Sequence, residues 1–359
     1  DDNPRNENPK KIRKEIKKKI TKSKLYEISN RDSAIGLAVN NLQSSEILIV
    51  AGKGHEKVQD YGRYKKYFSD KETILKYIRT KNRFLKNDLK LNILNEILKN
   101  KNISLKSKIR GGSINSKEVK KNDIFFAIKG KNKDGNKFVN EALNKGASLA
   151  IVNKKNNKKY LGKQIKVKNS LNFLTKMSQI IRISSSSKII AITGSCGKTS
   201  LKELLKMTLN NFGKTLSSPK SFNNKYGVPL SLFNLNTDHD YGVFEVGMDK
   251  RGEIDSLSKI IKPDIGIITN ISYAHAKNFQ NIKQIAIAKS EIINNINKDG
   301  FVVLNADDKF FYFHKKIANK KKLNILSFGM KKKADVKLVK IKKYKKKFKI
   351  FLSIHGKKK

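Results

Sequence analysis

The apolar residues in the second half of the chain fall into short continuous runs separated by helical stretches. Such runs are IIAIT at 189–193, GVFEV at 242–246, DIGIITNI at 264–271 and FVVLN at 301–305. Continuous apolar runs are typical of parallel strands that are covered on both faces. Because helical stretches follow these runs, the crossover rules favour a doubly wound, mostly parallel sheet. The tail at 334–354 alternates apolar and polar residues, which predicts a hairpin.

The first half contains shorter elements of the same kinds. EILIVAG at 46–52 predicts a strand between a helix over SAIGLAVNNL and a second helix that Asp70 would cap. Residues 91–185 carry a predicted helix, LNILNEILKN, and the predicted strands NDIFFAI and ASLAIVN. Lysine and asparagine near 81–90 and four serines at 184–187 are linker signals. We predict a multidomain α/β protein in which smaller α/β domains flank the central sheet, divided as 1–82, 83–186 and 187–359.

The charge of the chain leaves one alternative class of function open. The 80 Lys and Arg against 30 Asp and Glu give a formal net charge of +50, which permits a nucleic-acid partner. However, the lysines are spread along the whole chain among Asn and Ile, as AT-rich coding would produce. With 8% aromatic residues and no Trp, a platform for stacking bases is not evident. We therefore expect anionic small substrates and no nucleic acid, and keep a basic nucleic-acid-binding phosphate-loop protein as the alternative.

Two further observations concern the compartment. No apolar run approaches the roughly 18 residues that span a membrane, so we expect no membrane span. The chain has 1 Cys, which excludes a disulfide framework and fits a reducing cytoplasm.

The turn after the run at 189–193 is the strongest local sign of chemistry. Its backbone N–H groups and the helix that follows can bind phosphate, Lys198 can neutralise phosphate charge, and the Thr199 hydroxyl can bind Mg²⁺. The usual phosphate loop has one more glycine, at the position that Ile192 occupies here, so this loop is shorter. Cys196 fits a small-residue position better than a nucleophile, because no partner for it is visible. The loop consists of Thr193, Gly194, Ser195, Cys196, Gly197, Lys198 and Thr199.

Polar residues that follow the other predicted strands fall at the same edge of the sheet. In open parallel sheets, ligands bind at the carboxyl ends of the strands. Glu245, in an otherwise apolar strand, is interpreted as a metal ligand or as a strand-end salt-bridge partner. Lys289 lies on an apolar helical stretch, and its spacing alone is that of a surface lysine. The residues at this edge are Glu245, Asn270, His275, Asn305, Asp307 and Asp308.

Six segments carry further motifs: TGSCGKT (193–199), SFNNKYGVPL (221–230), FEVGMDKRGEI (244–254), TNISYAHAKNF (269–279), AKSEI (288–292) and LNADD (304–308). In this order they resemble the motifs of the Mur ligases, the ATP-dependent amide-forming enzymes of peptidoglycan synthesis. The resemblance covers about 85–359, and SINSKEVKKNDIFFAIKG and the following residues to 148 resemble the family's uridine-nucleotide-binding domain. It points to the member that joins D-alanyl-D-alanine to UDP-N-acetylmuramoyl-tripeptide through an acyl phosphate. A folylpolyglutamate-type ligase shares the ATP domain and is the alternative, but the uridine-like region argues against it.

The resemblance implies ATP and Mg²⁺ as cofactors and assigns roles to single residues. Lys198 would stabilise the transferring phosphoryl group. Thr199 and Glu245 would hold one Mg²⁺, and His275 would hold a second together with Lys289, whose amine would be carbamylated by CO₂ so that it presents a carboxylate. Asn305 and Asp308 would contact the adenosine, Asn223 and Asn224 would bind ATP or the UDP substrate, and Ser116 would belong to the uridine site.

One departure affects the uridine site. The family usually has Asp-Ser-Arg there, and this chain has Asn115-Ser116-Lys117. Lysine keeps the positive charge but loses the planar fork of donors.

Residues 1–80 resemble another member, the C-terminal domain of the ligase that adds diaminopimelate in the preceding step. The matching segments are DDNPRNENP and VAGKGHE. Arg5 can bind a carboxylate through two parallel hydrogen bonds. We therefore interpret the chain as a piece of a fusion of two consecutive ligases, both incomplete, and expect it to be cytoplasmic, monomeric and inactive in isolation. The substrate contacts implied in this region are Asp2, Asn3, Pro4, Arg5, Gly52 and Glu56.

Overall fold

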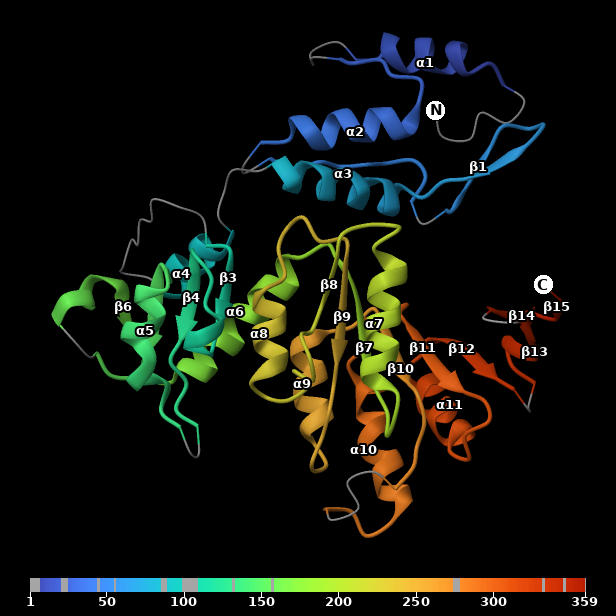
Figure 1. Cartoon of the computed structure of the whole chain (residues 1–359). Coiled ribbons are helices and arrows are strands. Elements are labelled where there is room, and N and C mark those ends of the chain that lie inside the picture. Colours follow the sequence, from blue (N-terminus) through green and yellow to red (C-terminus); the bar gives the residue numbers. More distant parts are fainter. Residues whose placement is uncertain are drawn as a thin grey trace. The chain divides into compact units, whose positions relative to one another are not determined.

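The computed structural model forms two compact units, residues 1–87 and 88–359, each with its own hydrophobic core (Figure 1). In the part of the chain that the structure describes, no helix is both long and apolar enough to cross a membrane. The described residues are 7–20, 25–43, 46–54, 56–84, 89–98, 109–130, 133–155, 158–273, 278–330, 333–344 and 347–358.

The core of the first unit forms between two of its helices. Ile35 and Val39 of α2 pack with Ile74 of α3 and with Phe68, and Leu48 joins them from the segment between the helices. β1 and β2 form an antiparallel pair. The elements are α1 (Pro9–Lys18), α2 (Arg31–Asn41), β1 (Val58–Asp60), β2 (Lys65–Tyr67) and α3 (Asp70–Phe84).

The predicted strand at 46–52 is wrong. Leu48 and Val50 pack into the core, but Ile47 and Ile49 are 87% and 83% exposed. A strand needs a hydrogen-bonded neighbour, and the described part of this unit pairs no strand with the segment.

The predicted cap at Asp70 is also wrong. The hydroxyl of Ser69 accepts the N–H of Glu72, so Ser69 caps α3, which begins at Asp70. The Asp70 carboxylate instead accepts two hydrogen bonds from Arg31, at 2.8 and 2.7 Å.

The second unit begins with a small parallel sheet whose strand order is β3-β4-β5-β6. Successive side chains of β4 point to opposite faces. Phe125 packs under α5, whereas Ile124 and Phe126 pack against Leu174 of α6. The predicted strands NDIFFAI and ASLAIVN are β4 and β5. The elements are α4 (Leu89–Leu98), β3 (Gly111–Ser113), η1 (Ser116–Glu118), β4 (Asp123–Phe126), η2 (Gly135–Phe138), α5 (Val139–Asn144), β5 (Leu149–Val152), η3 (Lys158–Lys163), β6 (Gln164–Lys166) and α6 (Ser170–Ser184).

The large sheet has the order β15-β14-β13-β12-β11-β10-β7-β9-β8. Its strands are parallel from β8 to β13, and the β13–β14 hairpin and β15 are antiparallel. The predicted doubly wound α/β fold is confirmed. The strands are β7 (Lys188–Thr193), β8 (Thr215–Ser217), β9 (Tyr241–Glu245), β10 (Ile265–Ile268), β11 (Phe301–Asn305), β12 (Asn324–Gly329), β13 (Val336–Tyr344), β14 (Lys347–Ile354) and β15 (Lys357–Lys358).

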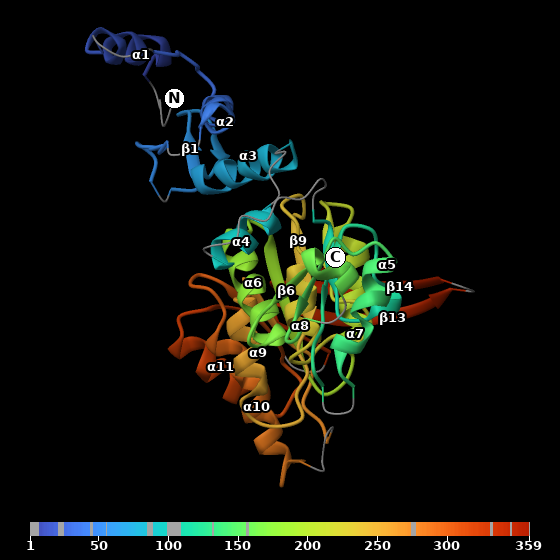
Figure 2. The ribbon, with the colours of Figure 1, turned by 90° about the vertical axis from the view of Figure 1, so that its left-hand side faces the viewer.

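Helices cover both faces of this sheet (Figures 1 and 2). Leu201, Leu205 and Leu209 of α7 cover Ile192 of β7 on one face. Helices α8, α9 and α10 contribute to the core on the other face. After β7 the chain builds β8 and β9 on one side and then crosses to β10 on the other, so the winding reverses at β7. The helices are α7 (Lys198–Leu209), α8 (Gly227–Phe233), α9 (Glu253–Ile261), α10 (Ile282–Asn294) and α11 (Phe311–Lys320).

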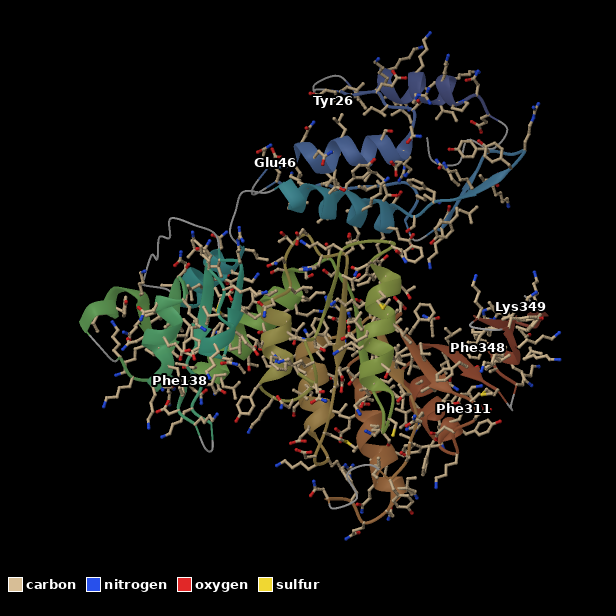
Figure 3. The ribbon with its side chains drawn as sticks, viewed as in Figure 1. Tyr26, Glu46, Phe138, Phe311, Phe348 and Lys349 are labelled. Carbon is tan, nitrogen blue, oxygen red and sulfur yellow. The ribbon has the colours of Figure 1, made fainter. Side chains whose placement is uncertain are left out.

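The predicted hairpin of the tail is β13 and β14. Its outer part projects beyond the helices, and Phe348 is 65% exposed beside Lys349 (Figure 3).

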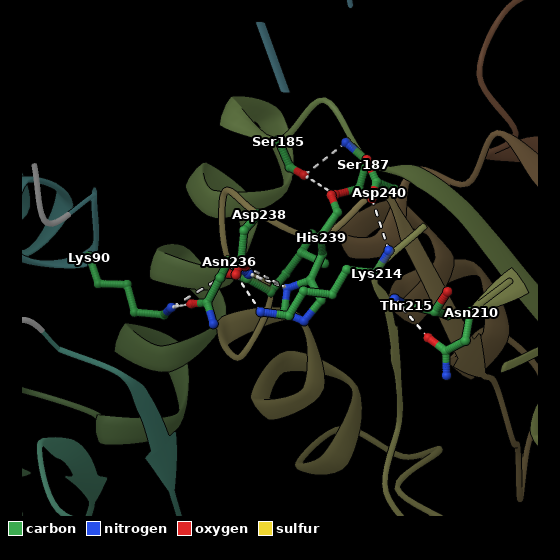
Figure 4. A network of polar contacts seen from close by, with 11 residues as sticks. Lys90, Ser185, Ser187, Asn210, Lys214, Thr215, Asn236, Asp238, His239 and Asp240 are labelled. Atoms are coloured by element: carbon green, nitrogen blue, oxygen red, sulfur yellow. Dashed lines mark hydrogen bonds and ion pairs between the residues drawn. The ribbon is translucent and has the colours of Figure 1, made fainter. Parts of the chain in front are cut away.

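A polar network holds the loop between α8 and β9, at the amino ends of the strands (Figure 4). Lys90 of α4 donates to the side-chain oxygen of Asn236, and Lys214 pairs with Asp238. The Nδ1 atom of His239 accepts the N–H of Asn236 at 3.0 Å, and burial lowers the pKa of His239. These contacts join α4 to the large sheet at the edge opposite the predicted site.

Candidate functional site

The loop between β7 and α7 depends on two glycines. Gly194 has φ +148°, and a Cβ there would lie 1.9 Å from Oγ1 of Thr269. Gly197 has φ +79°, but a Cβ there would meet nothing within 4 Å. The loop therefore packs tightly on β10 at Gly194 and is open at Gly197, where a ligand can approach the backbone.

Residues after β10 hold the loop by hydrogen bonds. The N–H of Cys196 donates to the side-chain oxygen of Asn270 at 3.0 Å, and the Thr269 hydroxyl donates to the carbonyl of Cys196 at 2.7 Å. The Ser195 hydroxyl donates to the carbonyl of Ser272 and accepts the N–H of the same residue. Cys196 is exposed and forms no disulfide. These hydrogen bonds thus fix the conformation of the loop and leave the N–H groups at the start of α7 accessible to a ligand.

Two lysines meet at the start of this loop. Lys198 donates to the carbonyl of Gly194 at 2.9 Å and to that of Ser195 at 3.4 Å. Lys289 of α10 donates to the same Gly194 carbonyl at 2.9 Å and is 1% exposed, so its interpretation as a surface lysine is wrong. Burial, followed by the positive charge of Lys198, lowers the pKa of Lys289 to about 7.

Glu245 ends β9 beside the start of α7. Its carboxylate accepts the hydroxyl of Thr199 at 2.8 Å and the side-chain amide of Asn223 at 2.9 Å. The side chain is 2% exposed. Both partners are neutral, so these contacts leave the negative charge of Glu245 available to a cation.

Asn305 and Asp308 lie at the end of β11. The Asn305 amide donates to the carbonyl of Thr269 at 3.4 Å. The two carboxylate oxygens of Asp308 accept the N–H groups of Ile271, at 2.7 Å, and of Phe310, at 2.8 Å. The structure thus brings the ends of β7, β9, β10 and β11 together, as the parallel sheet predicts.

Other predicted substrate residues have local partners. Asn224 accepts the N–H groups of Tyr226 and Gly227 in the turn that precedes α8. The buried hydroxyl of Ser116 donates to Glu141 at 2.9 Å.

Two of the predicted residues in the first unit are described. Gly52 has φ +102° in the turn before β1, and the N–H of Glu56 donates to the carbonyl of Lys53 at 3.2 Å. Their proposed roles stay predictions. Asp2, Asn3, Pro4, Arg5 and His275 lie outside the described residues.

The loop and the start of α7 fit a phosphate group. The N-cap of α7 is Gly197, which has no side chain to occupy the N–H groups of the first helical turn. Those donors and the ammonium group of Lys198 form an anion site of the kind found at helix N-termini.

The neighbouring oxygen atoms fit Mg²⁺. The Thr199 hydroxyl and the Glu245 carboxylate are hard oxygen donors, which Mg²⁺ prefers. Across the described residues, no three His, Cys, Asp or Glu side chains gather as a metal-binding group.

The structure also shows contributors that sequence reasoning did not single out. Thr269 fixes the loop through its hydroxyl, Lys202 of α7 is fully buried, and Glu291 of α10 accepts the N–H groups of Gly252 and Asp255 at the start of α9. Thr269 and Glu291 lie within motifs and Lys202 lies three residues after one, but a single sequence gives no sign of the contacts that they make.

Two family models match adjacent parts of the chain. A model described as the Mur ligase family catalytic domain matches residues 108–192, and one described as the Mur ligase middle domain matches residues 192–359. Both matches lie within the second unit.

Curated relatives and solved structures agree with these matches. The UDP-N-acetylmuramoyl-tripeptide–D-alanyl-D-alanine ligase of Rickettsia prowazekii is 42% identical over 228 residues, 63% of this chain and 50% of the relative. The ligase of the same name from Buchnera aphidicola subsp. Baizongia pistaciae is 38% identical over 213 residues, 59% of this chain and 46% of the relative.

Among solved structures, MurF from Acinetobacter baumannii has a TM-score of 0.65 at 30% identity, over 75% of this chain and 59% of that chain. MurF ligase from Thermotoga maritima, in complex with ADP, has a TM-score of 0.60 at 30% identity, over 70% of this chain and 57% of that chain. The chain thus spans about half the length of the curated relatives it matches. Through residues 108–359, the chain belongs to the Mur ligase family.

Proposed function

We propose that the second unit provides the nucleotide-binding part of a cytoplasmic ligase that joins D-alanyl-D-alanine to UDP-N-acetylmuramoyl-tripeptide at the expense of ATP. The observation that carries this is the meeting of Lys198, Thr199, Glu245 and Lys289 at one end of β7. The names of the relatives support the choice of substrates.

The reaction has two chemical steps. The γ-phosphoryl group of ATP passes to the terminal carboxylate of the tripeptide, which gives an acyl phosphate and ADP. The amine of D-alanyl-D-alanine then attacks the acyl carbon, the amide bond forms, and phosphate leaves with the loss of a proton from the amine. A bound Mg²⁺ would neutralise phosphate charge as the phosphoryl group moves.

The residues of the chain bind and orient the phosphates. The N–H groups at the start of α7 bind phosphate oxygens, and Lys198 moves from the Gly194 carbonyl to the transferring group. Thr199 and Glu245 would hold the metal. Asn305 and Asp308, beside Thr269 and Ile271, would border the adenosine.

Lys289 has the chemistry for carbamylation. With its pKa lowered to about 7, about half of its amine is neutral at neutral pH and can attack CO₂. An N–C bond forms, a proton is released, and the product is a carbamate that carries a negative charge. The modified side chain would then bind metal, with His275 as the second ligand.

A binding experiment tests whether the second unit binds ATP as proposed. The chain is titrated with ATP, with and without Mg²⁺, and we expect saturable binding that Mg²⁺ strengthens. Lys289 is tested separately with ¹³C-bicarbonate, which should give a carbamate NMR signal in the wild type that Lys289→Met lacks. Absence of both signals would contradict the proposed site.

Phosphate release tests the complete reaction in a longer protein that contains the chain, because the chain alone is expected to be inactive. Release should require UDP-N-acetylmuramoyl-tripeptide and increase with D-alanyl-D-alanine. Release that ignores the dipeptide would contradict the proposed substrate and favour a sister ligase. Salt-sensitive oligonucleotide binding without ATP binding would favour the nucleic-acid alternative.

A further inference from the structure

Lys202 is a fully buried lysine that the proposed mechanism does not use. It lies on α7 one turn after Lys198 and is 0% exposed. Its Nζ atom donates to the carbonyl of Lys220 and lies 3.3 Å from the carboxylate of Glu203. Burial of an ammonium group costs free energy unless hydrogen bonds or an ion pair compensate for the lost water. The buried position of Lys202 therefore depends on these two partners.

The partner carbonyl belongs to the bend of a loop. Residues 218–226 connect β8 with α8, and Lys220, within the first part of this connection (218–223), has φ +47°. A residue other than glycine in the left-handed region is strained by roughly 1–2 kcal/mol. The hydrogen bond from Lys202 therefore stabilises an unfavourable bend that the loop alone would tend to lose.

Both ends of the same loop hold Glu245. At one end, the hydroxyl of Ser218 accepts the N–H of Glu245 at 3.2 Å. At the other, the Asn223 amide donates to the Glu245 carboxylate at 2.9 Å, and the Asn223 carbonyl accepts the N–H of Gly247 at 2.8 Å. The carboxylate also accepts the hydroxyl of Thr199, which lies on the helix that carries Lys202.

We propose that Lys202 is a positioning residue that fixes loop 218–223, and through it the orientation of Asn223 on Glu245. Helix α7, which carries Lys198, thus also orients the Glu245 carboxylate. Thr199 does so by a direct hydrogen bond, and Lys202 does so through the loop. The metal-binding consequence rests on the proposed function, whereas the effect on the loop does not.

The first experiment measures the loop without any ligand. Lys202→Met keeps an unbranched, apolar side chain that suits a buried position, and Lys206→Met makes the same change one turn further along α7. Hydrogen exchange is followed by mass spectrometry in peptides that cover 218–223 and β7. Lys202→Met should speed exchange about tenfold in the loop peptide and leave β7 protected, while Lys206→Met should match the wild type. Unchanged exchange in the loop would overturn the proposal.

The second experiment measures the consequence for the site. ATP affinity is determined with and without Mg²⁺ for Lys202→Met, Asn223→Ala and the double variant. Loss of a residue that orients a metal ligand typically costs about ten- to a hundredfold in metal affinity, so the gain in affinity from Mg²⁺ should fall by about tenfold in each single variant.

The double variant decides whether the two residues act together. If Lys202 acts through Asn223, the gain in ATP affinity from Mg²⁺ should be no smaller in the double variant than in the more affected single variant. Additive losses, or a loosened loop with unchanged Mg²⁺ dependence, would overturn the proposal. If the wild type does not bind ATP, the proposed function fails, and the exchange experiment still decides whether Lys202 holds the loop.

Discussion

Lys198 and Lys289 donate hydrogen bonds to one and the same carbonyl oxygen, that of Gly194, each at 2.9 Å. One lysine comes from the helix after the loop and the other from α10, which lies 95 residues away along the chain from Gly194. Two ammonium groups on one oxygen repel each other, and this repulsion adds to the effect of burial on the pKa of Lys289. The pair places positive charge beside the start of the loop, which favours an anion there.

Lys289 should make the stability of the chain depend on pH. Its folded pKa of about 7 lies below the roughly 10.4 of a lysine in an unfolded chain. Between these values the unfolded chain binds a proton that the folded chain has lost, so stability rises with pH. The unfolding free energy should rise by up to about 1.4 kcal/mol per pH unit between these two pKa values. The stability gained at high pH is fully lost once pH falls through 7, where both states bind the proton.

Urea unfolding of the wild type and Lys289→Met, in CO₂-free buffers from about pH 6 to pH 9, measures this dependence. The difference in unfolding free energy should be largest at pH 7 and below, in favour of the Met variant, and should narrow at higher pH. Lys283→Met, at an exposed position of the same helix, serves as the control. A difference that does not change with pH would show that Lys289 keeps an ordinary pKa.

Gly194 and Gly197 should respond differently to alanine. At Gly194 the new Cβ would lie 1.9 Å from Oγ1 of Thr269 and 3.1 Å from its backbone nitrogen, so β10 and the loop must move apart. At Gly197 the space is open and only the cost of the left-handed backbone remains, roughly 1–2 kcal/mol. We expect Gly194→Ala to lower the unfolding free energy by about 3 kcal/mol or more.

Adding Thr269→Ala to Gly194→Ala should restore part of that stability, because it removes the clashing hydroxyl. Urea unfolding of the three variants and the wild type provides the comparison. Equal losses at Gly194 and Gly197 would mean that the loop is not packed on Thr269.

Glu245→Gln should separate nucleotide binding from metal dependence. Glutamine keeps the size of the side chain and one oxygen that can accept a hydrogen bond, but it removes the negative charge. ATP should still bind through the N–H groups of α7, while the gain in affinity from Mg²⁺ should fall by about ten- to a hundredfold. Isothermal titration with and without Mg²⁺ measures both, and Glu96→Gln, exposed on α4, is the matched control. If Mg²⁺ still strengthens ATP binding in Glu245→Gln as much as in the wild type, Glu245 is not a metal ligand.

The parallel strands of the large sheet could be predicted because strands that are buried on both faces consist of consecutive apolar residues. The runs at 189–193, 242–246 and 301–305 match β7, β9 and β11 within a residue at each end. The three-residue strands β3, β6 and β8 are too short to show a period, and β12 was not distinguished from its surroundings. The strand expected at 46–52 failed for another reason, because pairing depends on a neighbour and not on the segment itself.

The candidate site was predictable only in part. Topology alone placed the loop, Glu245 and Asn305 at one edge, and Thr199 indeed contacts Glu245. It could not reveal that Lys289 and Lys202 are buried, since burial of a lysine depends on tertiary partners and lysines are frequent throughout this chain. The division into three domains stays a prediction.

Arg182 provides a test of how α6 is joined to the large sheet. Its guanidinium group is buried, and it donates to the carbonyls of Ile261 and Lys262, each at 2.7 Å, where α9 ends. It also lies 3.3 Å from the carboxylate of Asp264, which accepts the N–H of Ile189 at the start of β7. A cation at a helix C-terminus is favourable, and this one also satisfies carbonyls that the helix leaves without partners.

Arg182→Met should therefore lower the unfolding free energy of the second unit by about 2–5 kcal/mol, because it leaves the two carbonyls without this donor and removes the cation beside the Asp264 carboxylate. Lys176→Met, exposed on the same helix, should change it by less than about 0.5 kcal/mol. Urea unfolding followed by circular dichroism gives both values. A loss in Arg182→Met no larger than in Lys176→Met would mean that α6 is held by its apolar face alone, since Leu174, Met177 and Ile181 would then account for its packing.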